Sequence, residues 1–228
     1  MNNTKRFSDR VSNYVKYRPA YPKEIIGELF SRFNLNANNV IADIGSGTGI
    51  LTALFLKNGN KVFAVEPNNE MRNHAENTLA EFPNFYSING TAEDTTLPDK
   101  SIDMIVAAQA FHWFDQPAAN KEFKRIAVNN APAVLIWNDR QVSTAFEMAY
   151  EQLLRTYGTD YTTVNHRNVS EEQLGAFYYP EPYTVIHLPN YQVFNFEGLK
   201  GRLLSSSYIP NDTHPDYKKM MQELQIIY

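Results

Sequence analysis

Three glycines at alternate positions follow a short apolar run and an acidic residue. The segment reads Asp43-x-Gly45-x-Gly47-x-Gly49, and no lysine occurs between it and Lys57. Glycine is favoured where a ligand approaches the backbone, because a β-carbon would collide with that ligand. Without a lysine the segment lacks the cation of a phosphate-binding loop. It therefore predicts a ligand-binding turn that opens with a carboxylate and suits a ligand with positive charge.

The spacing of these glycines also departs from the dinucleotide fingerprint G-x-G-x-x-G, because position 50 is Ile. S-adenosylmethionine carries a sulfonium and an ammonium and no phosphate, so its charge fits this turn. We therefore expect S-adenosylmethionine as the cofactor. An NAD(P)-dependent oxidoreductase on a similar sheet and a non-catalytic cofactor-binding partner protein are the alternatives.

Two more acidic residues follow predicted strands and suit other parts of such a cofactor. Glu66 ends the second strand 23 residues after Asp43, close to the spacing of about 20 expected for an acid that binds ribose hydroxyls. Glu93, after Ala92, can accept a hydrogen bond from an adenine amino group, while a backbone N–H serves the ring nitrogen. Met71 lies near where the base would stack, and core packing explains it equally well.

The fourth strand leads into a loop that carries Gln109, Phe111, His112 and Trp113. Ligands of open α/β sheets bind outside the carboxyl ends of the strands, so this loop should face the reaction. His112 is the only histidine expected on this rim and is the candidate general base. The alternative is that His112 is a structural hydrogen-bonding residue beside an aromatic wall.

Two arginines are candidates for binding a carboxylate. Arg140 follows the fifth predicted strand, and Arg18 lies in the segment Tyr17-Arg18-Pro19-Ala20-Tyr21-Pro22. A guanidinium grips a carboxylate in bidentate fashion, which would suit a small organic acid as acceptor or the carboxylate of the cofactor. Both arginines could instead pair with structural carboxylates, and the segment around Arg18 could be a surface arm rather than a lid.

Apolar runs and helix signals alternate along the chain and predict an α/β fold with a mostly parallel, doubly wound, Rossmann-like sheet and a small helical and aromatic cap. We expect an N-terminal helical arm or lid at 1–34, a cofactor-binding core at 35–158, and the cap with the C-terminal part of the same domain at 159–228. The predicted strands cover residues 40–44, 61–66, 85–88, 102–108 and 132–137, and a further extended segment covers 184–196.

The composition restricts the class of protein. The chain has 228 residues, a net charge of −4, no cysteine and 43% hydrophobic residues. No basic tract suggests a nucleic-acid partner, and no thiolate metal site is possible. No apolar run approaches the roughly 18 residues of a spanning helix. We therefore expect a cytoplasmic globular protein, monomeric or homodimeric, with no metal and no membrane or nucleic-acid partner.

The glycine motif, Glu66 and the acid at 93 resemble those of class I S-adenosylmethionine-dependent methyltransferases over residues 35–140. The strings YRPAYP at 17–22, FHWF at 111–114 and GRLLSSSY at 201–208 resemble the type-11 branch, which includes trans-aconitate methyltransferase and the ubiquinone/menaquinone-pathway enzymes. The resemblance implies a seven-stranded sheet, a cofactor in the glycine loop and a cap that selects a small-molecule acceptor. It also implies a final antiparallel strand beside the fifth, yet the sequence ends in a predicted helix. Either the sequence is incomplete, which we favour, or the sheet lacks that strand.

Together these arguments predict two sets of site residues. The acceptor side should hold His112, Arg140 and Trp113. The cofactor should contact Asp43, Gly45, Ser46, Gly47, Gly49, Glu66, Pro67, Met71, Ala92, Glu93, Gln109, Tyr17 and Arg18.

Overall fold

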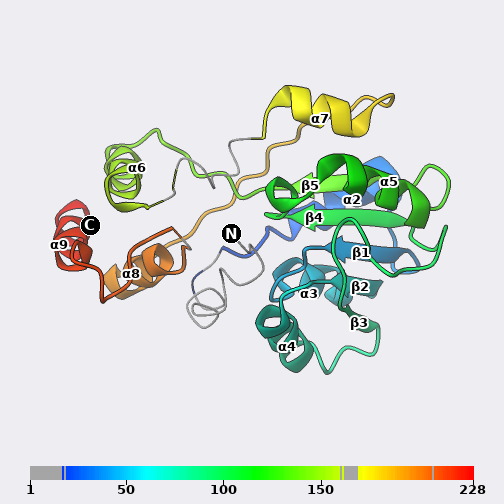
Figure 1. Cartoon of the computed structure of the whole chain (residues 1–228), viewed down its shortest axis with the longest axis horizontal. Coiled ribbons are helices and arrows are strands. Elements are labelled where there is room, and N and C mark those ends of the chain that lie inside the picture. The colour runs from blue at the N-terminus through cyan, green and yellow to red at the C-terminus, as the bar shows by residue number, and fades with distance from the viewer. Residues whose placement is uncertain (1–16, 18, 160, 162–168, 207) are drawn as a thin grey trace. The chain divides into compact units, whose positions relative to one another are not determined.

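The computed structural model describes residues 17, 19–159, 161, 169–206 and 208–228 (Figure 1). These residues fall into two compact units. The first contains residues 20–138 and 169–190, and the second contains the described residues of 139–168 and 191–228 together with Tyr17 and Pro19. Residues 1–16 of the predicted N-terminal helical arm, and Arg18, lie outside the described residues.

A parallel sheet forms the centre of the first unit, with strand order β3-β2-β1-β4-β5. This confirms the predicted α/β, doubly wound fold. The described residues contain five strands in this sheet, so the two further strands implied by the resemblance are not among them. The strands are β1 (Val40–Ile44), β2 (Lys61–Val65), β3 (Phe85–Ile88), β4 (Met104–Ala108) and β5 (Ala133–Ile136).

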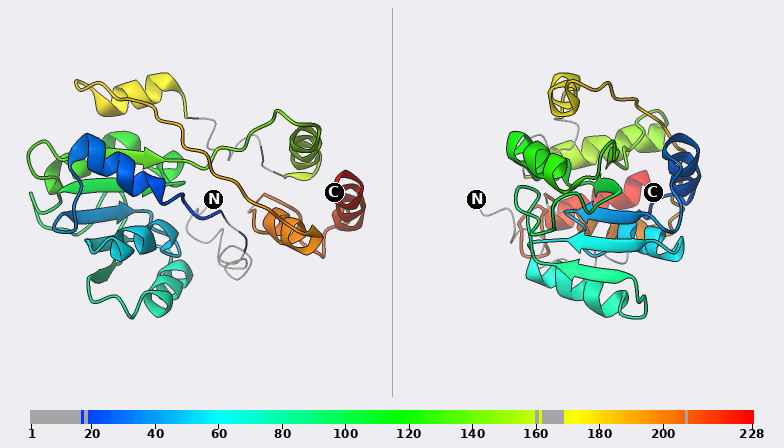
Figure 2. Two further views of the ribbon diagram at one scale, coloured as in Figure 1. Left: turned by 180° about the vertical axis from the view of Figure 1, so that it is seen from behind. Right: turned by 90° about the vertical axis from the view of Figure 1, so that its right-hand side faces the viewer.

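Helices cover both faces of this sheet, as Figures 1 and 2 show. Side chains alternate along a strand, so Ile41 and Ala42 of β1 point to opposite faces. Ile41 packs in the apolar cluster that includes α2, α3 and α4, whereas Ala42 packs in the cluster of α5 and α7. The helices are α2 (Glu24–Phe33), α3 (Ile50–Lys57), α4 (Asn69–Thr78), α5 (Gln116–Ile126) and α7 (Glu171–Tyr178).

Side-chain caps start two of these helices directly beyond strand ends. The Asn68 side chain accepts a hydrogen bond from the backbone N–H of Met71 at the start of α4. The Asp115 side chain does the same for Ala118 at the start of α5. Such caps satisfy backbone donors that the first helical turn leaves unpaired. They fix the loops that follow β2 and β4 at the carboxyl edge of the sheet.

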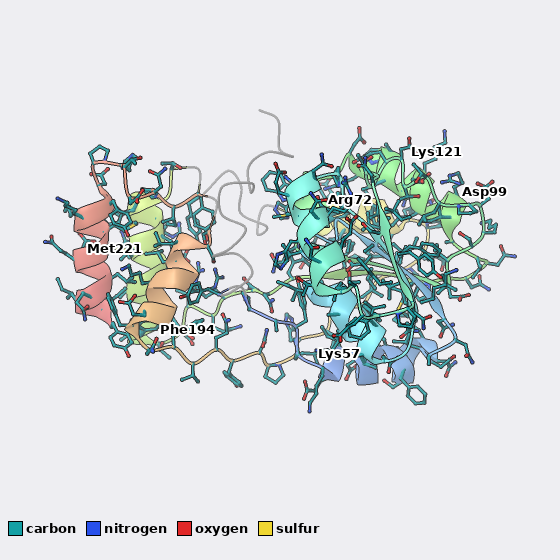
Figure 3. The ribbon with its side chains drawn as sticks, turned by 90° about the horizontal axis from the view of Figure 1, so that it is seen from below. Lys57, Arg72, Asp99, Lys121, Phe194 and Met221 are labelled. Atoms are coloured by element: carbon teal, nitrogen blue, oxygen red, sulfur yellow. The ribbon has the colours of Figure 1, made fainter. Side chains whose placement is uncertain are left out.

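The second unit is helical and has an apolar core of its own. Tyr150 and Leu154 of α6 (Ala145–Tyr157) pack with Leu203 of α8 (Phe196–Leu204) and with Met220 and Leu224 of α9 (Tyr217–Ile227). Phe194 and Met221 pack against this core and are labelled in Figure 3. The three predicted segments, 1–34, 35–158 and 159–228, do not coincide with these two units. Helix α2, from the predicted arm, buries its apolar face on the sheet of the first unit, whereas α6, from the predicted core, buries its own against α8 and α9 of the second unit.

Three local features of the structure differ from the sequence predictions or were not predicted. The predicted extended segment 184–196 forms no strand, and α8 already begins within it. Helix α6 begins after Thr144, whose capping box with Glu147 was not predicted. Helix α9 begins after Asp216 without a side-chain cap. Within the described part of the chain, no helix has the length and apolar character needed to cross a bilayer.

Candidate functional site

The glycine loop follows β1, and all three of its glycines have positive φ angles, 70° at Gly45, 58° at Gly47 and 82° at Gly49. Their surroundings differ. A β-carbon on Gly45 would lie 2.6 Å from the Ala110 Cβ, and one on Gly49 would lie 2.7 Å from the Leu79 Cδ1. These two glycines therefore allow protein groups to pack closely. The prediction that ligand approach explains all three glycines is too simple.

Gly47 is the exception in this loop. A β-carbon there would meet only the Met71 Sδ, at 3.8 Å, among the described atoms within 4 Å. With respect to the described residues, the space in front of Gly47 is therefore open, apart from the buried Met71 side chain at its edge. The loop keeps its shape through hydrogen bonds from the Ser46 N–H to the Val65 carbonyl and from the Gly49 N–H to the Ser46 carbonyl. Open space beside a fixed glycine backbone is what a closely bound ligand requires.

Glu66, directly after β2, ties this loop to the next helix. Its Oε2 accepts a hydrogen bond from the Gly47 N–H at 2.8 Å, and its Oε1 accepts one from the Asn68 N–H at 2.8 Å. Burial raises the pKa of the Glu66 carboxyl, and the two backbone donors oppose that shift. Each carboxylate oxygen has two lone pairs, so both oxygens keep the capacity to accept another donor. Pro67 separates Glu66 from the helix cap Asn68.

Asp43 opens the loop and is almost completely buried, with 1% of its surface exposed. Its Oδ2 accepts a hydrogen bond of 2.6 Å from the Thr52 hydroxyl. Its Oδ1 and the buried Thr48 hydroxyl have no hydrogen-bond partner among the described residues. Burial is the main cause that raises the pKa of Asp43 to about 7. Buried polar atoms are nearly always paired in folded proteins, so these two atoms fit the polar groups of a bound ligand.

Sequence reasoning did not identify Thr48 or Thr52. Thr52 lies in the first turn of α3, where its hydroxyl can reach back to the strand-end carboxylate. A buried strand-end acid needs a nearby donor, and a hydroxyl in the following helical turn is the signal that could have revealed it. Nothing comparable in the local sequence indicates Thr48.

Ala92 and Glu93 lie in the loop after β3. Ala92 is buried in the core cluster that includes α5. Glu93 is half-buried, and its Oε1 accepts a hydrogen bond of 2.8 Å from the backbone N–H of Asp115. The side chain predicted to read adenine therefore also holds the loop that follows β4. One carboxylate can do both, because it has several acceptor positions.

The rim after β4 combines a strained backbone with aromatic packing. Gln109 has φ of 55°, and its side-chain amide donates to the Asn138 carbonyl at 3.2 Å. Phe111 is fully buried and packs edge-on against Phe177 of α7. It is therefore part of the core, not of an open wall. The rings of His112 and Trp113 are 4.7 Å apart, and both side chains are half-buried.

Arg140 and Tyr17 belong to the second unit. Arg140 donates to the Glu151 Oε2 at 2.5 Å and to the Tyr161 hydroxyl at 2.7 Å. The ring of Tyr17 lies directly against Gly201, where any β-carbon would overlap it. Two of the strings that carried the family resemblance thus meet in this contact. Arg140 has the structural carboxylate partner that the sequence left open as its alternative.

Comparisons with known proteins support the sequence reading. Residues 42–134 match the family described as a methyltransferase domain. An uncharacterised methyltransferase of Schizosaccharomyces pombe is 33% identical over 149 residues, which cover 65% of this chain and 58% of that protein. An uncharacterised methyltransferase of Mycobacterium tuberculosis is 36% identical over 134 residues, which cover 59% of this chain and 52% of that protein. The chain thus spans little more than half of the length of these relatives.

A solved structure covers more of the chain at lower identity. The structure titled "Putative Type II Methyltransferase" from Anaeromyxobacter dehalogenans aligns with 93% of this chain and 90% of its own, with a TM-score of 0.65 and 22% identity. At that identity the likeness concerns the fold alone. It extends the similarity of architecture beyond the residues that match the family.

Proposed function

We propose that this chain, whose residues 42–134 match a methyltransferase domain family, is a class I enzyme that transfers a methyl group from S-adenosylmethionine to a small-molecule acceptor. The single observation that carries the cofactor assignment is the open space at Gly47, bordered by the carboxylate of Glu66. The family match and the fold imply the same cofactor.

The residues at three strand ends fit different parts of this cofactor. The Oδ1 of Asp43 and the Thr48 hydroxyl, which lack a partner among the described residues, suit the amino acid end, where an ammonium needs acceptors. Glu66 suits the ribose, because each oxygen can accept a hydroxyl in addition to its backbone donor. Glu93 and the backbone beside Ala92 suit the adenine edge. Met71 borders the open space at Gly47 and suits contact with an apolar surface of the cofactor.

The chemistry follows from positioning. Bound S-adenosylmethionine supplies a methyl carbon that its sulfonium already activates. The chain has to exclude water and align the acceptor with that carbon. A base is needed only where the acceptor must lose a proton, and His112 beside Trp113 is the proposed group for that role.

The acceptor class is proposed only as a small molecule. An organic acid was the more specific expectation, with Arg140 as its cation. The ion pair of Arg140 with Glu151 weakens this expectation, because an acceptor carboxylate would have to compete with an internal one. His112→Ala and Arg140→Gln separate the cases: a large loss of kcat in the first indicates a protonated acceptor, and a raised KM in the second without loss of stability indicates an acid.

The alternatives make different predictions for ligand binding. An oxidoreductase would bind NAD(P), and a non-catalytic partner protein would bind the cofactor without turnover. The match of residues 42–134 to a methyltransferase domain supports neither the oxidoreductase nor the non-catalytic partner protein. A cytoplasmic location and a monomeric or homodimeric state stay predictions.

Thermal unfolding with added ligand tests the proposal. Only a ligand that binds the folded state raises the melting temperature. We expect S-adenosylhomocysteine to raise it and NAD to leave it unchanged, and the reverse result would favour the oxidoreductase. A screen of small acids and phenols with methyl-labelled cofactor then identifies the acceptor.

A further inference from the structure

The loop that joins β3 to β4 is held in a conformation that it would not adopt alone. Residues 89–101 contain no helix or strand. Two residues that are not glycine have positive φ angles, 60° at Thr96 and 50° at Lys100. A β-branched residue such as threonine rarely adopts this conformation, which persists only where surrounding contacts enforce it. The loop therefore needs strong anchors.

The strongest anchor is a buried carboxylate on α5. Only 7% of Glu122 is exposed, and Thr95 in the loop is fully buried. The Oε1 of Glu122 accepts hydrogen bonds from both the backbone N–H and the hydroxyl of Thr95, the first at 2.9 Å. Arg125 donates to both oxygens of the same carboxylate, each at 2.7 Å. Both oxygens of this buried group thus have donors.

The Glu122 side chain is also held in its ionised form. Hydrogen bonds from Arg125 are the largest cause that lowers the pKa of Glu122 to about 2, against the opposing effect of burial. The carboxylate therefore stays ionised at neutral pH, and charge-assisted hydrogen bonds are roughly twice as strong as neutral ones. A loop residue bound in this way is fixed relative to α5.

The same helix holds the loop at two more places. Glu93 accepts from the backbone N–H of Asp115, which caps α5. The Ala92 side chain lies in the core cluster together with Phe123 of α5. Ala92, Glu93 and Thr95 are therefore all attached to one rigid element. The segment between Ala92 and Thr95 has little freedom to shift along the sheet edge.

We propose that Glu122 is a positioning residue for adenine recognition, acting through Thr95 to hold Ala92 and Glu93 in the register that reads the adenine edge. This inference rests on the proposed function, because it assumes that Ala92 and Glu93 face the adenine. Glu122 lies on α5 and acts through the loop rather than through a contact of its own. Substitution of Glu122 should therefore change the selectivity of the site for adenine, in addition to any change in the stability of the fold.

The chain offers a matched control in the outer part of the same network. Arg125 also binds the Asp99 Oδ1 at 2.5 Å, and the Asp99 side chain is 75% exposed. Figure 3 labels Asp99 at the surface of the first unit. Asp99→Asn removes the negative charge that pairs with Arg125 but leaves Glu122 and Thr95 bound to each other. A purely electrostatic effect of the network would appear in this variant too.

The experiment compares two ligands that differ at the edge of the base that the loop is proposed to read. Calorimetry gives the dissociation constants of S-adenosylhomocysteine and of S-inosylhomocysteine, in which an oxygen replaces the 6-amino group and the neighbouring N1 carries a proton. The wild-type protein should prefer the first by about tenfold or more, the worth of one hydrogen bond to a charged acceptor. Thr95→Val and Glu122→Gln should reduce this preference to near unity, while Asp99→Asn should keep it.

Melting temperatures measured on the same samples separate positioning from folding. Thr95→Val removes only one hydroxyl, so it remains informative where Glu122→Gln fails to fold. Suppose instead that Thr95→Val binds S-adenosylhomocysteine normally and keeps the wild-type preference for it over S-inosylhomocysteine. That result would overturn the role of Glu122 and leave the proposed function standing. Failure of the wild-type protein to bind S-adenosylhomocysteine would overturn the proposed function, and the inference with it.

Discussion

The backbone N–H of Gly47 donates a hydrogen bond of 2.8 Å to the Oε2 of Glu66, which joins the loop after β1 to the end of β2. A second hydrogen bond from Asn68 to the Oε1 joins the same carboxylate to the start of α4. Glu66 therefore holds the open glycine in place in addition to its proposed contact with the ribose. Substitutions of Glu66 therefore change both the position of the Gly47 backbone and the proposed contact with the ribose.

Glu66→Gln should weaken binding of S-adenosylhomocysteine by about 1–3 kcal/mol, because a neutral amide replaces a charged acceptor. Its one carbonyl oxygen cannot satisfy Gly47 and Asn68 together, so a small loss of melting temperature should accompany the change. Calorimetry measures the affinity, with Glu81→Gln as the control at an exposed position. Unchanged affinity in Glu66→Gln would reject the ribose assignment.

Binding should also depend on pH through Asp43. Its pKa rises from 3.8 to about 7 in the folded protein, so the folded state retains a proton that the unfolded chain has lost. This contribution to stability is full below about pH 4 and is lost as the pH rises through about 7. The ammonium of the ligand's amino acid end favours the ionised carboxylate, so we expect affinity for S-adenosylhomocysteine to increase with pH up to about 7 and then level off.

Asp43→Asn tests this assignment, because the amide keeps the shape and an acceptor for Thr52 but does not titrate. Glu66, whose pKa burial also raises, contributes in the same direction and remains in the variant. The pH dependence of affinity should therefore become shallower in Asp43→Asn. An identical pH profile in both proteins would show that Asp43 does not face the charged end of the ligand.

Arg140→Gln should destabilise the second unit by about 1–3 kcal/mol, because it removes a charged donor from the buried carboxylate of Glu151. Hydrogen bonds from Tyr161 and Arg140 hold the pKa of Glu151 below its usual range although burial opposes them. This stabilisation is present above the pKa of the unfolded glutamate and is lost as the pH falls through the lower folded value. The difference between variant and wild type should therefore shrink in acid.

Arg155→Gln is the matched control for this prediction. Arg155 binds the same carboxylate at 3.1 Å, but its side chain is 55% exposed. An exposed ion pair contributes about 0–1 kcal/mol, so this variant should unfold close to the wild type in denaturant. Equal losses in both variants would contradict the special role of Arg140.

The fold could be predicted because its signals are local. Apolar runs that end in acids at Asp43 and Glu66, followed by helix caps such as Asn68, indicate strand, turn and helix without knowledge of distant residues. The parallel pairing then follows from the helical connections of α/β units, whereas the strand order, with β1 beside β4, was not predicted. These features identified the sheet and its carboxyl edge.

The contacts of the site could not be predicted because they depend on tertiary structure. Nothing near Arg140 in the sequence indicates that Tyr161 and Glu151 bind it, and nothing near Glu93 indicates Asp115. The same holds for the packing of Tyr17 on Gly201. Sequence motifs identify residues that are available for chemistry, whereas the partners of those residues depend on the folded chain.

Calorimetric titration of S-adenosylhomocysteine into Gly47→Val tests the central claim, that the cofactor lies in the glycine loop. Among the described atoms within 4 Å, a β-carbon at Gly47 would meet only the Met71 Sδ, so the added side chain fills the proposed ligand space. Gly59→Val is the control, since Gly59 also has a positive φ, of 93°, but lies after α3. The account predicts no measurable binding in folded Gly47→Val and wild-type affinity in folded Gly59→Val. Wild-type affinity in Gly47→Val would contradict it.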